Sequence, residues 1–383
     1  MTKGRYKFLF NPITIGNMRL SNRVAMAPMS TNFGNPEYPG LASERHKNYY
    51  AARAKGGVGL IIVEATNVNP LSSARKFGLS LHSDESVDSL RKLVKSIKKH
   101  GTRCAIQLNH SGRIGPLKVD SSGDIDQKTI SNFSPLAVSR LPHPVTGMLT
   151  KQLRRKQLND IIRYFVAAVK RARTAGFDAI EIHGAHGYLL NEFVSPCTNQ
   201  RTDEYGGCLE NRCRFPIELV QRIKDGVGDD IVLSYRLSVI DGGISWPEIV
   251  LFVQNLQQNG VQLLHVSAGT NETFATMEKV IPTKSYPKAR LASYSEKLKK
   301  VTDVPVMVAQ RIATPRLADE IIRKGQADLV ALGRPLITDP CWADKARMGR
   351  QDAIRRCIYC NQGCIGNIIR EKSLSCMQNP DVG

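Results

Sequence analysis

The stretch "LNDIIRYFVAAVKRARTAGFDAIEIH", residues 158–183, contains one complete helix-to-strand unit. Its apolar residues recur at three- and four-residue spacing as far as Gly176, the pattern of an amphipathic helix that ends at a glycine. The run "AIEIH" (179–183) that follows is short, apolar and β-branched, as expected for a buried strand. A helix followed at once by such a strand is typical of parallel βα repeats.

The same alternation of helix-like and strand-like runs continues along the chain. Eight repeats predict an α/β fold in the form of a closed (β/α)8 TIM barrel rather than an open sheet. Long connections follow the third, fourth and sixth strands (109–149, 184–209 and 268–293), and such loops build the active-site face of a barrel. The predicted strands are "RVAMAPM" (23–29), "GLIIVE" (59–64), "CAIQL" (104–108), "AIEIH" (179–183), "IVLSYRL" (231–237), "LLHVS" (263–267), "VMVAQ" (306–310) and "LVALG" (329–333).

Composition excludes several classes of protein. The 383 residues are 42% hydrophobic, enough to bury a large core, and the N-terminus carries no apolar run of signal-peptide length. No window approaches a membrane span, so we expect a soluble, cytoplasmic protein with no membrane partner. The net charge is +20, but no nucleic-acid-binding motif accompanies the basic runs. We therefore expect no nucleic-acid partner, and assign the charge to an anionic substrate or an acidic redox partner.

Four of the nine cysteines fall in "RRCIYCNQGCIGNIIREKSLSC" (355–376) with the spacing C-x2-C-x3-C-x11-C. An odd number of cysteines in a reducing cytosol argues against a disulfide framework, so the group indicates metal or redox chemistry. Thiolates select iron–sulfur clusters or zinc. Because the group follows the eighth repeat, we predict a barrel over 1–347 and a metal-binding segment over 348–383. The predicted ligands are Cys357, Cys360, Cys364 and Cys376.

Polar residues that a buried strand would not favour lie at or just beyond the predicted strand ends, where a barrel has its catalytic face. The stretches "RIATP" (311–315) and "GRPL" (333–336) follow the seventh and eighth strands, the usual place of a phosphate in such barrels. A phosphate-bearing ligand is therefore expected. The polar residues are Gln107, His110, His183, His186, Tyr188, Arg236, Arg311 and Arg334.

The stretch "EIHGAHGYLLNEFVSP" (181–196) resembles the FMN-binding barrels of the Old Yellow Enzyme family. The stretches "TNQRTDEYGGCLENRCRFPIELV" (198–220) and "ADLVALGRPLITDP" (327–340) agree with that resemblance. The cysteine spacing is similar to that of the iron–sulfur branch, which includes 2,4-dienoyl-CoA reductase, enoate reductase and trimethylamine dehydrogenase. The resemblance implies FMN and a [4Fe–4S] cluster on the four cysteines, with structural zinc as the alternative.

The resemblance also implies roles for particular residues. Pro28, Met29 and Ser30 would lie against the flavin, and Gln107 and Arg236 would hold its pyrimidine edge, where a guanidinium and an amide donor stabilise the reduced ring. The phosphate would bind at segments that contain Arg311, Gly333 and Arg334. We expect this phosphate site to be separate from the thiolates.

His183 and His186 match the histidine pair that binds a substrate carbonyl or carboxyl oxygen, and Tyr188 matches the tyrosine that protonates the substrate carbon. Hydride transfer to a β-carbon leaves negative charge on the carbonyl oxygen, which such donors stabilise. The expected reaction is reduction of a C=C bond conjugated to a carbonyl, in an acid or a thioester that is anionic or CoA-linked. The chain has only two tryptophans, which disfavours an aromatic bowl for amine oxidation.

Three other interpretations stay open at this point. The same site could catalyse the reverse reaction as a desaturase. Alternatively, the chain could carry electrons without a selective substrate pocket, or the barrel could lack bound flavin. No G-x-G-x-x-G dinucleotide motif occurs in the chain. We therefore expect NAD(P)H to act as an indirect donor, through a redox partner protein or a missing dinucleotide-binding domain.

Overall fold

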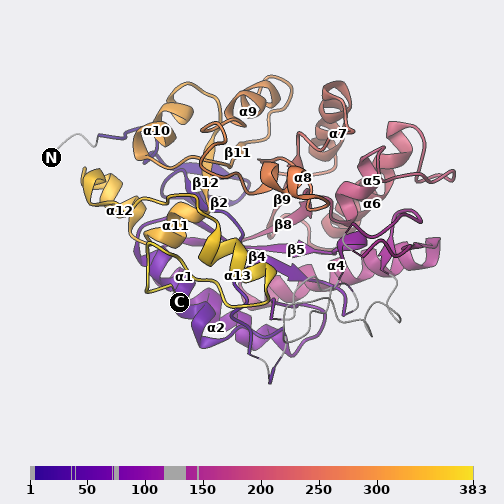
Figure 1. Ribbon diagram of the computed structural model, residues 1–383, viewed down its shortest axis with the longest axis horizontal. Coiled ribbons are helices and arrows are strands. Elements are labelled where there is room, and N and C mark those ends of the chain that lie inside the picture. Colours follow the sequence, from indigo (N-terminus) through magenta and orange to yellow (C-terminus); the bar gives the residue numbers. More distant parts are fainter. Residues whose placement is uncertain are drawn as a thin grey trace.

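A closed barrel of eight parallel strands forms the centre of the computed structural model, in the order β3-β4-β5-β8-β9-β10-β11-β12 (Figure 1). The model describes residues 5–35, 37–38, 40–70, 72, 77–115, 135–144 and 146–382. Each barrel strand coincides with a predicted run, so the TIM-barrel prediction is confirmed. The strands are β3 (Val24–Met26), β4 (Leu60–Asn67), β5 (Arg103–Asn109), β8 (Ala179–Gly184), β9 (Val232–Ser238), β10 (Leu263–Ser267), β11 (Val306–Val308) and β12 (Leu329–Leu332).

Helices surround the barrel, and α4 (Arg155–Ala175) shows why they form. Its buried stripe includes Leu158, Phe165 and Val169, and the helix ends at Gly176, whose φ of 94° is the left-handed conformation that glycine adopts most readily. No helix in the described ranges is long and apolar enough to cross a membrane. The other outer helices are α1 (Glu44–Lys55), α2 (Ser86–Lys98), α6 (Leu209–Val227), α7 (Trp246–Gln258), α9 (Ala292–Leu298), α10 (Pro315–Arg323), α11 (Arg334–Thr338) and α12 (Trp342–Arg347).

A short antiparallel hairpin, β1 (Ile13–Ile15) and β2 (Met18–Leu20), precedes the barrel and is absent from the sequence prediction. Its buried side chains pack with inward-facing residues at the amino ends of the barrel strands, such as Leu60. The hairpin turn needs Gly16, because φ is 53° there and a Cβ would lie 2.5 Å from Gln262 Nε2. The hairpin therefore closes the barrel at the end opposite to its active-site face.

The loops at the carboxyl ends of the strands carry further short elements. They are α5 (Leu189–Val194) after β8, α8 (Phe274–Val280) after β10, the turn Gly112–Ile114 after β5, and the two-residue parallel strands β6 (Leu136–Ala137) and β7 (Lys151–Gln152). Parts of the long loop over 109–149 lie outside the described residues.

The cysteine-containing segment after α12 packs back onto the barrel (yellow in Figure 1). It contains a 3-10 turn (Gln351–Ala353), a π-helical turn (Gln362–Gly366) and α13 (Asn367–Ile369). Leu374 N donates to Thr31 O over 2.8 Å, and Asn32 Nδ2 donates to Lys372 O over 3.2 Å. The segment is thus bonded to the loop after β3. The domain boundary at residue 348 stays a prediction.

Candidate active site

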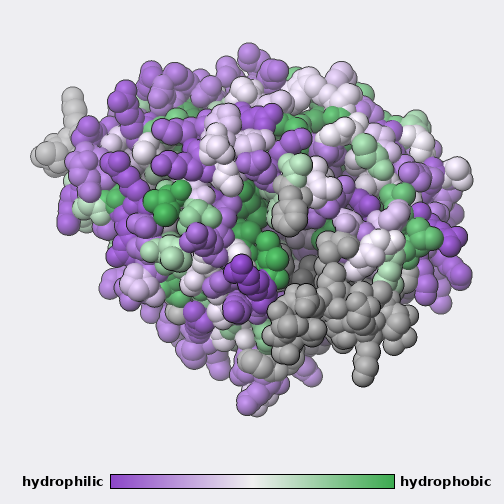
Figure 2. Space-filling model, in the orientation of Figure 1, coloured by the Kyte–Doolittle hydropathy of each residue, from purple (hydrophilic) through white to green (hydrophobic). Residues whose placement is uncertain are grey.

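One cavity at the carboxyl ends of the barrel strands brings together all the predicted flavin and substrate residues. In Figure 2, apolar residues gather near the middle of the face that looks onto this end of the barrel. His110 is also buried, but it does not line the cavity, and its Nδ1 accepts a hydrogen bond from Gly112 N. The predicted residues that line the cavity are Pro28, Met29, Ser30, Gln107, His183, His186, Tyr188, Arg236, Arg311, Gly333 and Arg334.

The tight turn after β8 places two histidines and a tyrosine together. The ring of His183 lies 5.0 Å from that of His186 and 4.8 Å from that of Tyr188, both edge-on. His186 has a φ of 65°, and its backbone N–H donates to Ser238 Oγ. Burial, and then the charge of Arg236, hold the pKa of both histidines well below the usual 6.5. Both imidazoles are therefore neutral near pH 7.

Ser267, at the end of β10, connects this turn to Arg236. His186 Nε2 and Ser267 Oγ lie 2.6 Å apart, and Arg236 Nη2 donates to the same hydroxyl over 3.3 Å. The serine thereby fixes the orientation of His186. Sequence reasoning did not single it out, although its place at a strand end was a usable signal.

A buried charged group lies below these residues inside the barrel. Gln107 Nε2 donates to Glu181 Oε1 over 2.7 Å, and Glu181 Oε2 lies 2.8 Å from His265 Nδ1. Burial alone would raise the pKa of Glu181, but His265, Arg236 and Gln107 together hold it below its ordinary value. Glu181 is thus ionised. Glu181 and His265 could not be recognised from the sequence, because a polar residue within a strand run does not reveal its partner across the barrel.

The amide of Gln107 both lines the cavity and donates to Glu181. A carboxylate only accepts hydrogen bonds, so the amide nitrogen must point to Glu181. The amide nitrogen carries two hydrogens and this bond to Glu181 uses one of them, so the role of Gln107 as a donor to the reduced flavin stays a prediction. Its carbonyl oxygen is a further group that could accept from a ring N–H.

Two arginines form the other side of the cavity, where a phosphate is expected. Arg311 is buried, and neither its Nε nor its Nη1 has a hydrogen-bond partner among the described residues. Arg334 Nη1 donates to Pro282 O and to Asn361 Oδ1, over 2.7 Å and 2.6 Å. Burying an unpaired guanidinium is costly, so Arg311 indicates that an anionic group belongs in this part of the cavity.

The four predicted metal ligands line a second, smaller cavity next to the first, between α11 and the cysteine-containing segment. Backbone N–H groups donate to two of the sulfurs, from Tyr359 to Cys357 and from Gln378 to Cys376, both over 3.4 Å. Within the described part of the chain, no group of three or more His, Cys, Asp or Glu side chains has the arrangement of a metal site. The thiols therefore share a cavity, but a metal centre is not shown.

The cysteine segment and the two arginines are in direct contact, so the expected separation of the phosphate site from the thiolates is wrong. Asn361 accepts from Arg334, and Tyr359 lies under both guanidinium groups. Cys364 lines both cavities.

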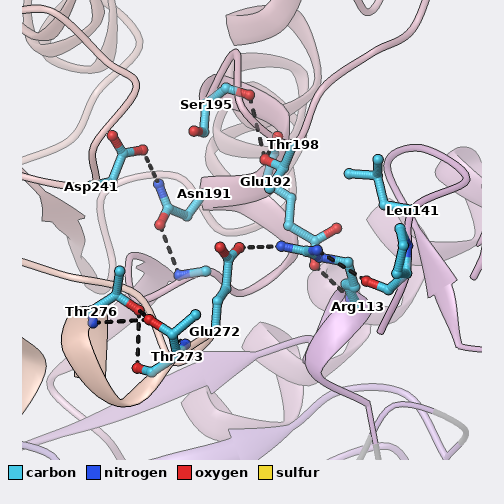
Figure 3. A network of polar contacts seen from close by, with 12 residues as sticks. Arg113, Leu141, Asn191, Glu192, Ser195, Thr198, Asp241, Glu272, Thr273 and Thr276 are labelled. Carbon is cyan, nitrogen blue, oxygen red and sulfur yellow. Dashed lines mark hydrogen bonds and ion pairs between the residues drawn. The ribbon is translucent and has the colours of Figure 1, made fainter. Parts of the chain in front are cut away.

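A polar network at the rim of the barrel holds the loops around the His–Tyr turn (Figure 3). Arg113, after β5, forms an ion pair with Glu272, after β10, and its backbone N–H donates to the buried Glu192 of α5. Asn191 Oδ1 accepts from Gly187 N over 2.8 Å. These contacts therefore connect the loops after β5, β8 and β10 beside Tyr188.

A model of the NADH:flavin oxidoreductase / NADH oxidase family matches residues 8–353. The chain belongs to this family. It is 39% identical over 380 residues to an NADH oxidase of Thermoanaerobacter brockii, covering 98% of the chain and 56% of that protein. It is 31% identical over 406 residues to a cinnamate reductase of Clostridium sporogenes, covering 100% of the chain and 59% of that protein.

Among solved structures, a 2-naphthoyl-CoA reductase in complex with 2-naphthoyl-CoA has a TM-score of 0.90 and 27% sequence identity, covering 98% of the chain and 57% of that protein. The chain thus spans little more than half the length of these relatives. Membership of the NADH:flavin oxidoreductase family supports FMN as the bound cofactor and a reduced nicotinamide as an electron source. The unpaired Arg311 and Arg236 nitrogens in the cavity fit a cofactor with a phosphate and an electron-rich ring edge.

Proposed function

We propose that this protein is an FMN-dependent oxidoreductase that reduces an activated C=C bond conjugated to a carbonyl, in an enoate or an enoyl or dienoyl thioester. The observation that carries the proposal is the neutral pair His183 and His186 beside Tyr188, in the same cavity as Gln107 and Arg236. The names of two relatives, a cinnamate reductase and a 2-naphthoyl-CoA reductase, support this substrate class.

Bound FMN would supply a hydride to the substrate β-carbon. His183 and His186 hold the carbonyl oxygen with ring N–H donors, and these hydrogen bonds strengthen as negative charge develops on that oxygen. Because the imidazoles are neutral, they would hold the carbonyl of a thioester or the carboxyl group of an enoate through hydrogen bonds. Tyr188 then transfers its hydroxyl proton to the α-carbon.

The remaining residues of the cavity would hold the cofactor. Arg236 would place a positive charge at the pyrimidine edge, and Gln107 would offer its remaining N–H and its carbonyl oxygen to that edge. Pro28, Met29 and Ser30 come from the loop after β3, which buried Glu64 holds by accepting from Thr31 Oγ1 over 2.9 Å. Arg311, Gly333 and Arg334 would bind the phosphate.

We further propose that Cys357, Cys360, Cys364 and Cys376 hold a [4Fe–4S] cluster, which would place the chain in the iron–sulfur branch of its family. Three observations support this assignment: the sequence spacing, the shared cavity, and the backbone donors to two sulfurs. A cluster would accept single electrons from a partner protein or a further domain. Structural zinc is the alternative, and metal analysis of anaerobically purified protein distinguishes the two.

Kinetics of the oxidative half-reaction test the proposed reaction. Photoreduced protein is mixed anaerobically with cinnamaldehyde, with a cinnamoyl thioester and with cinnamate, and flavin reoxidation is followed. His183→Ala with His186→Ala should weaken binding of the carbonyl compounds, whereas Tyr188→Phe should slow reoxidation with little loss of binding. Tyr164→Phe, at a half-exposed position on α4, is the matched control. Unchanged kinetics in both site variants would contradict the proposal.

A further inference from the structure

Tyr359 lies in the cysteine segment, but its ring forms part of the wall of the larger cavity. The residue sits between Cys357 and Cys360 with a φ of 58° and is 7% exposed. Its ring centroid lies 4.4 Å from Arg311 Cζ and 4.6 Å from Arg334 Cζ. One aromatic ring therefore contacts both arginines, and such contacts stabilise cations.

The Tyr359 hydroxyl is buried and has no hydrogen-bond partner among the described residues. The same holds for Nε and Nη1 of Arg311, which lines the same cavity. All three groups can donate, and leaving a buried donor without an acceptor is unfavourable. A ligand that satisfies them must be rich in acceptors, which describes a phosphate.

Asn361 provides a second connection between the cysteine segment and the arginines. Its Oδ1 accepts from Arg334 Nη1 over 2.6 Å, and its Nδ2 donates to Ile281 O over 3.2 Å. The position of Arg334 therefore depends on how the chain around Cys360 is folded.

We propose that Tyr359 is a phosphate-binding residue for FMN that the cysteine segment contributes to the barrel. Its ring contacts both guanidinium groups, and its hydroxyl donates to a phosphate oxygen. This inference rests on the proposed phosphate roles of Arg311 and Arg334. It has the consequence that FMN affinity and the folded state of the cysteine segment are linked, each stabilising the other.

The test compares FMN with riboflavin, which lacks the phosphate. Holoprotein is equilibrated with mixtures of FMN and riboflavin, and the bound flavin is separated and quantified. Tyr359→Phe, which keeps the ring, should lower the preference for FMN about tenfold, the loss of one hydrogen bond to a charged group. Tyr359→Leu, which removes the ring as well, should lower it by up to about a hundredfold. Tyr164→Leu on α4 is the control and should leave the preference unchanged.

An unchanged preference for FMN over riboflavin in folded Tyr359→Leu overturns the proposal. If Tyr359→Leu does not fold, Tyr359→Phe provides the test. An unchanged preference for FMN in Tyr359→Phe then overturns the proposal. The experiment measures the ratio of FMN to riboflavin bound by the protein, and this ratio does not depend on turnover or on metal content. Failure to reduce a C=C bond would therefore contradict the proposed function and leave this result standing.

Discussion

Gln107 Nε2 donates a hydrogen bond to Glu181 Oε1 over 2.7 Å at the centre of the barrel. Glu181 is fully buried, and its other oxygen lies 2.8 Å from His265 Nδ1. An ionised carboxylate therefore sits below the proposed flavin site and close enough to Arg236 for its negative charge to offset part of the positive charge of that arginine.

Replacing Glu181 with Gln should raise the FMN midpoint potential. The substitution keeps the size and removes a negative charge that disfavours the anionic reduced ring, so the shift should be on the order of 50 mV. Anaerobic titration with reference dyes measures it. Glu218→Gln, which changes the charge of a residue on the outer helix α6, is the matched control. A potential that is unchanged or lower in Glu181→Gln would show that this carboxylate does not act on the flavin.

Glu192 should make the protein less stable as the pH rises towards 8. Burial raises the pKa of this carboxyl to about 8, against the lowering effects of the Arg113 and Val138 N–H groups and the Arg113 charge. Its stabilising contribution is complete below the unfolded value of 4.5 and is lost as the pH rises through about 8, because the folded state binds the extra proton in that window. Glu192→Gln should remove this dependence, on the order of 4 kcal/mol between pH 5 and 8.

Urea unfolding of both proteins from pH 5 to 9 measures the difference. His110 has the opposite sign, because burial lowers its pKa to about 3 and stability is lost as the pH falls below the ordinary 6.5. That contribution is common to both proteins and cancels in the comparison. Glu210→Gln, at an exposed position of α6, should follow the wild type. If the unfolding free energies of Glu192→Gln and wild type change with pH in the same way, Glu192 is ionised in the folded state.

The barrel could be predicted from sequence because each buried parallel strand is a short apolar run next to a helix pattern, and helices such as the one ending at Gly176 stop at a recognisable residue. The convergence of His183 and Arg236 followed from the same rule, since the ends of parallel strands meet at one face. The β1–β2 hairpin could not be predicted, because three-residue strands carry too little periodicity. Nor could the contact of Tyr359 with Arg311, because it joins segments that only the closed barrel brings together.

Replacing Cys360 with Ser should reduce both the iron content and the retention of FMN. A serine hydroxyl is a poor ligand for iron, and Asn361, the next residue, accepts from Arg334. Iron, sulfide and flavin per chain are measured after anaerobic gel filtration. Cys341→Ser, at an exposed cysteine outside the four, should keep both cofactors. An iron-depleted Cys360→Ser protein that retains all of its FMN would show that flavin binding does not depend on the cysteine segment. Zinc without iron in the wild-type protein would contradict the proposed [4Fe–4S] cluster.

The last prediction concerns the source of electrons: the chain alone should be reduced slowly by NADH or NADPH and quickly by a one-electron donor. A cluster is redundant if a nicotinamide docks directly on the flavin, and becomes necessary when electrons arrive singly from another protein or domain. The chain spans 56% of the NADH oxidase that it resembles, which leaves room in that relative for such a domain. The net charge of +20 offers an acidic donor an attractive surface, and this attraction should weaken as salt rises.

Flavin bleaching after anaerobic mixing with NADH, NADPH or reduced viologen measures the three rates side by side. The Cys360→Ser protein, reloaded with FMN, serves as the matched variant, because it should lose fast reduction by viologen and keep whatever direct reaction the nucleotides have. Fast, saturable bleaching by either nucleotide in both proteins would refute the external donor. The nicotinamide would then bind in the cavity next to His183 and His186, in competition with the unsaturated substrate.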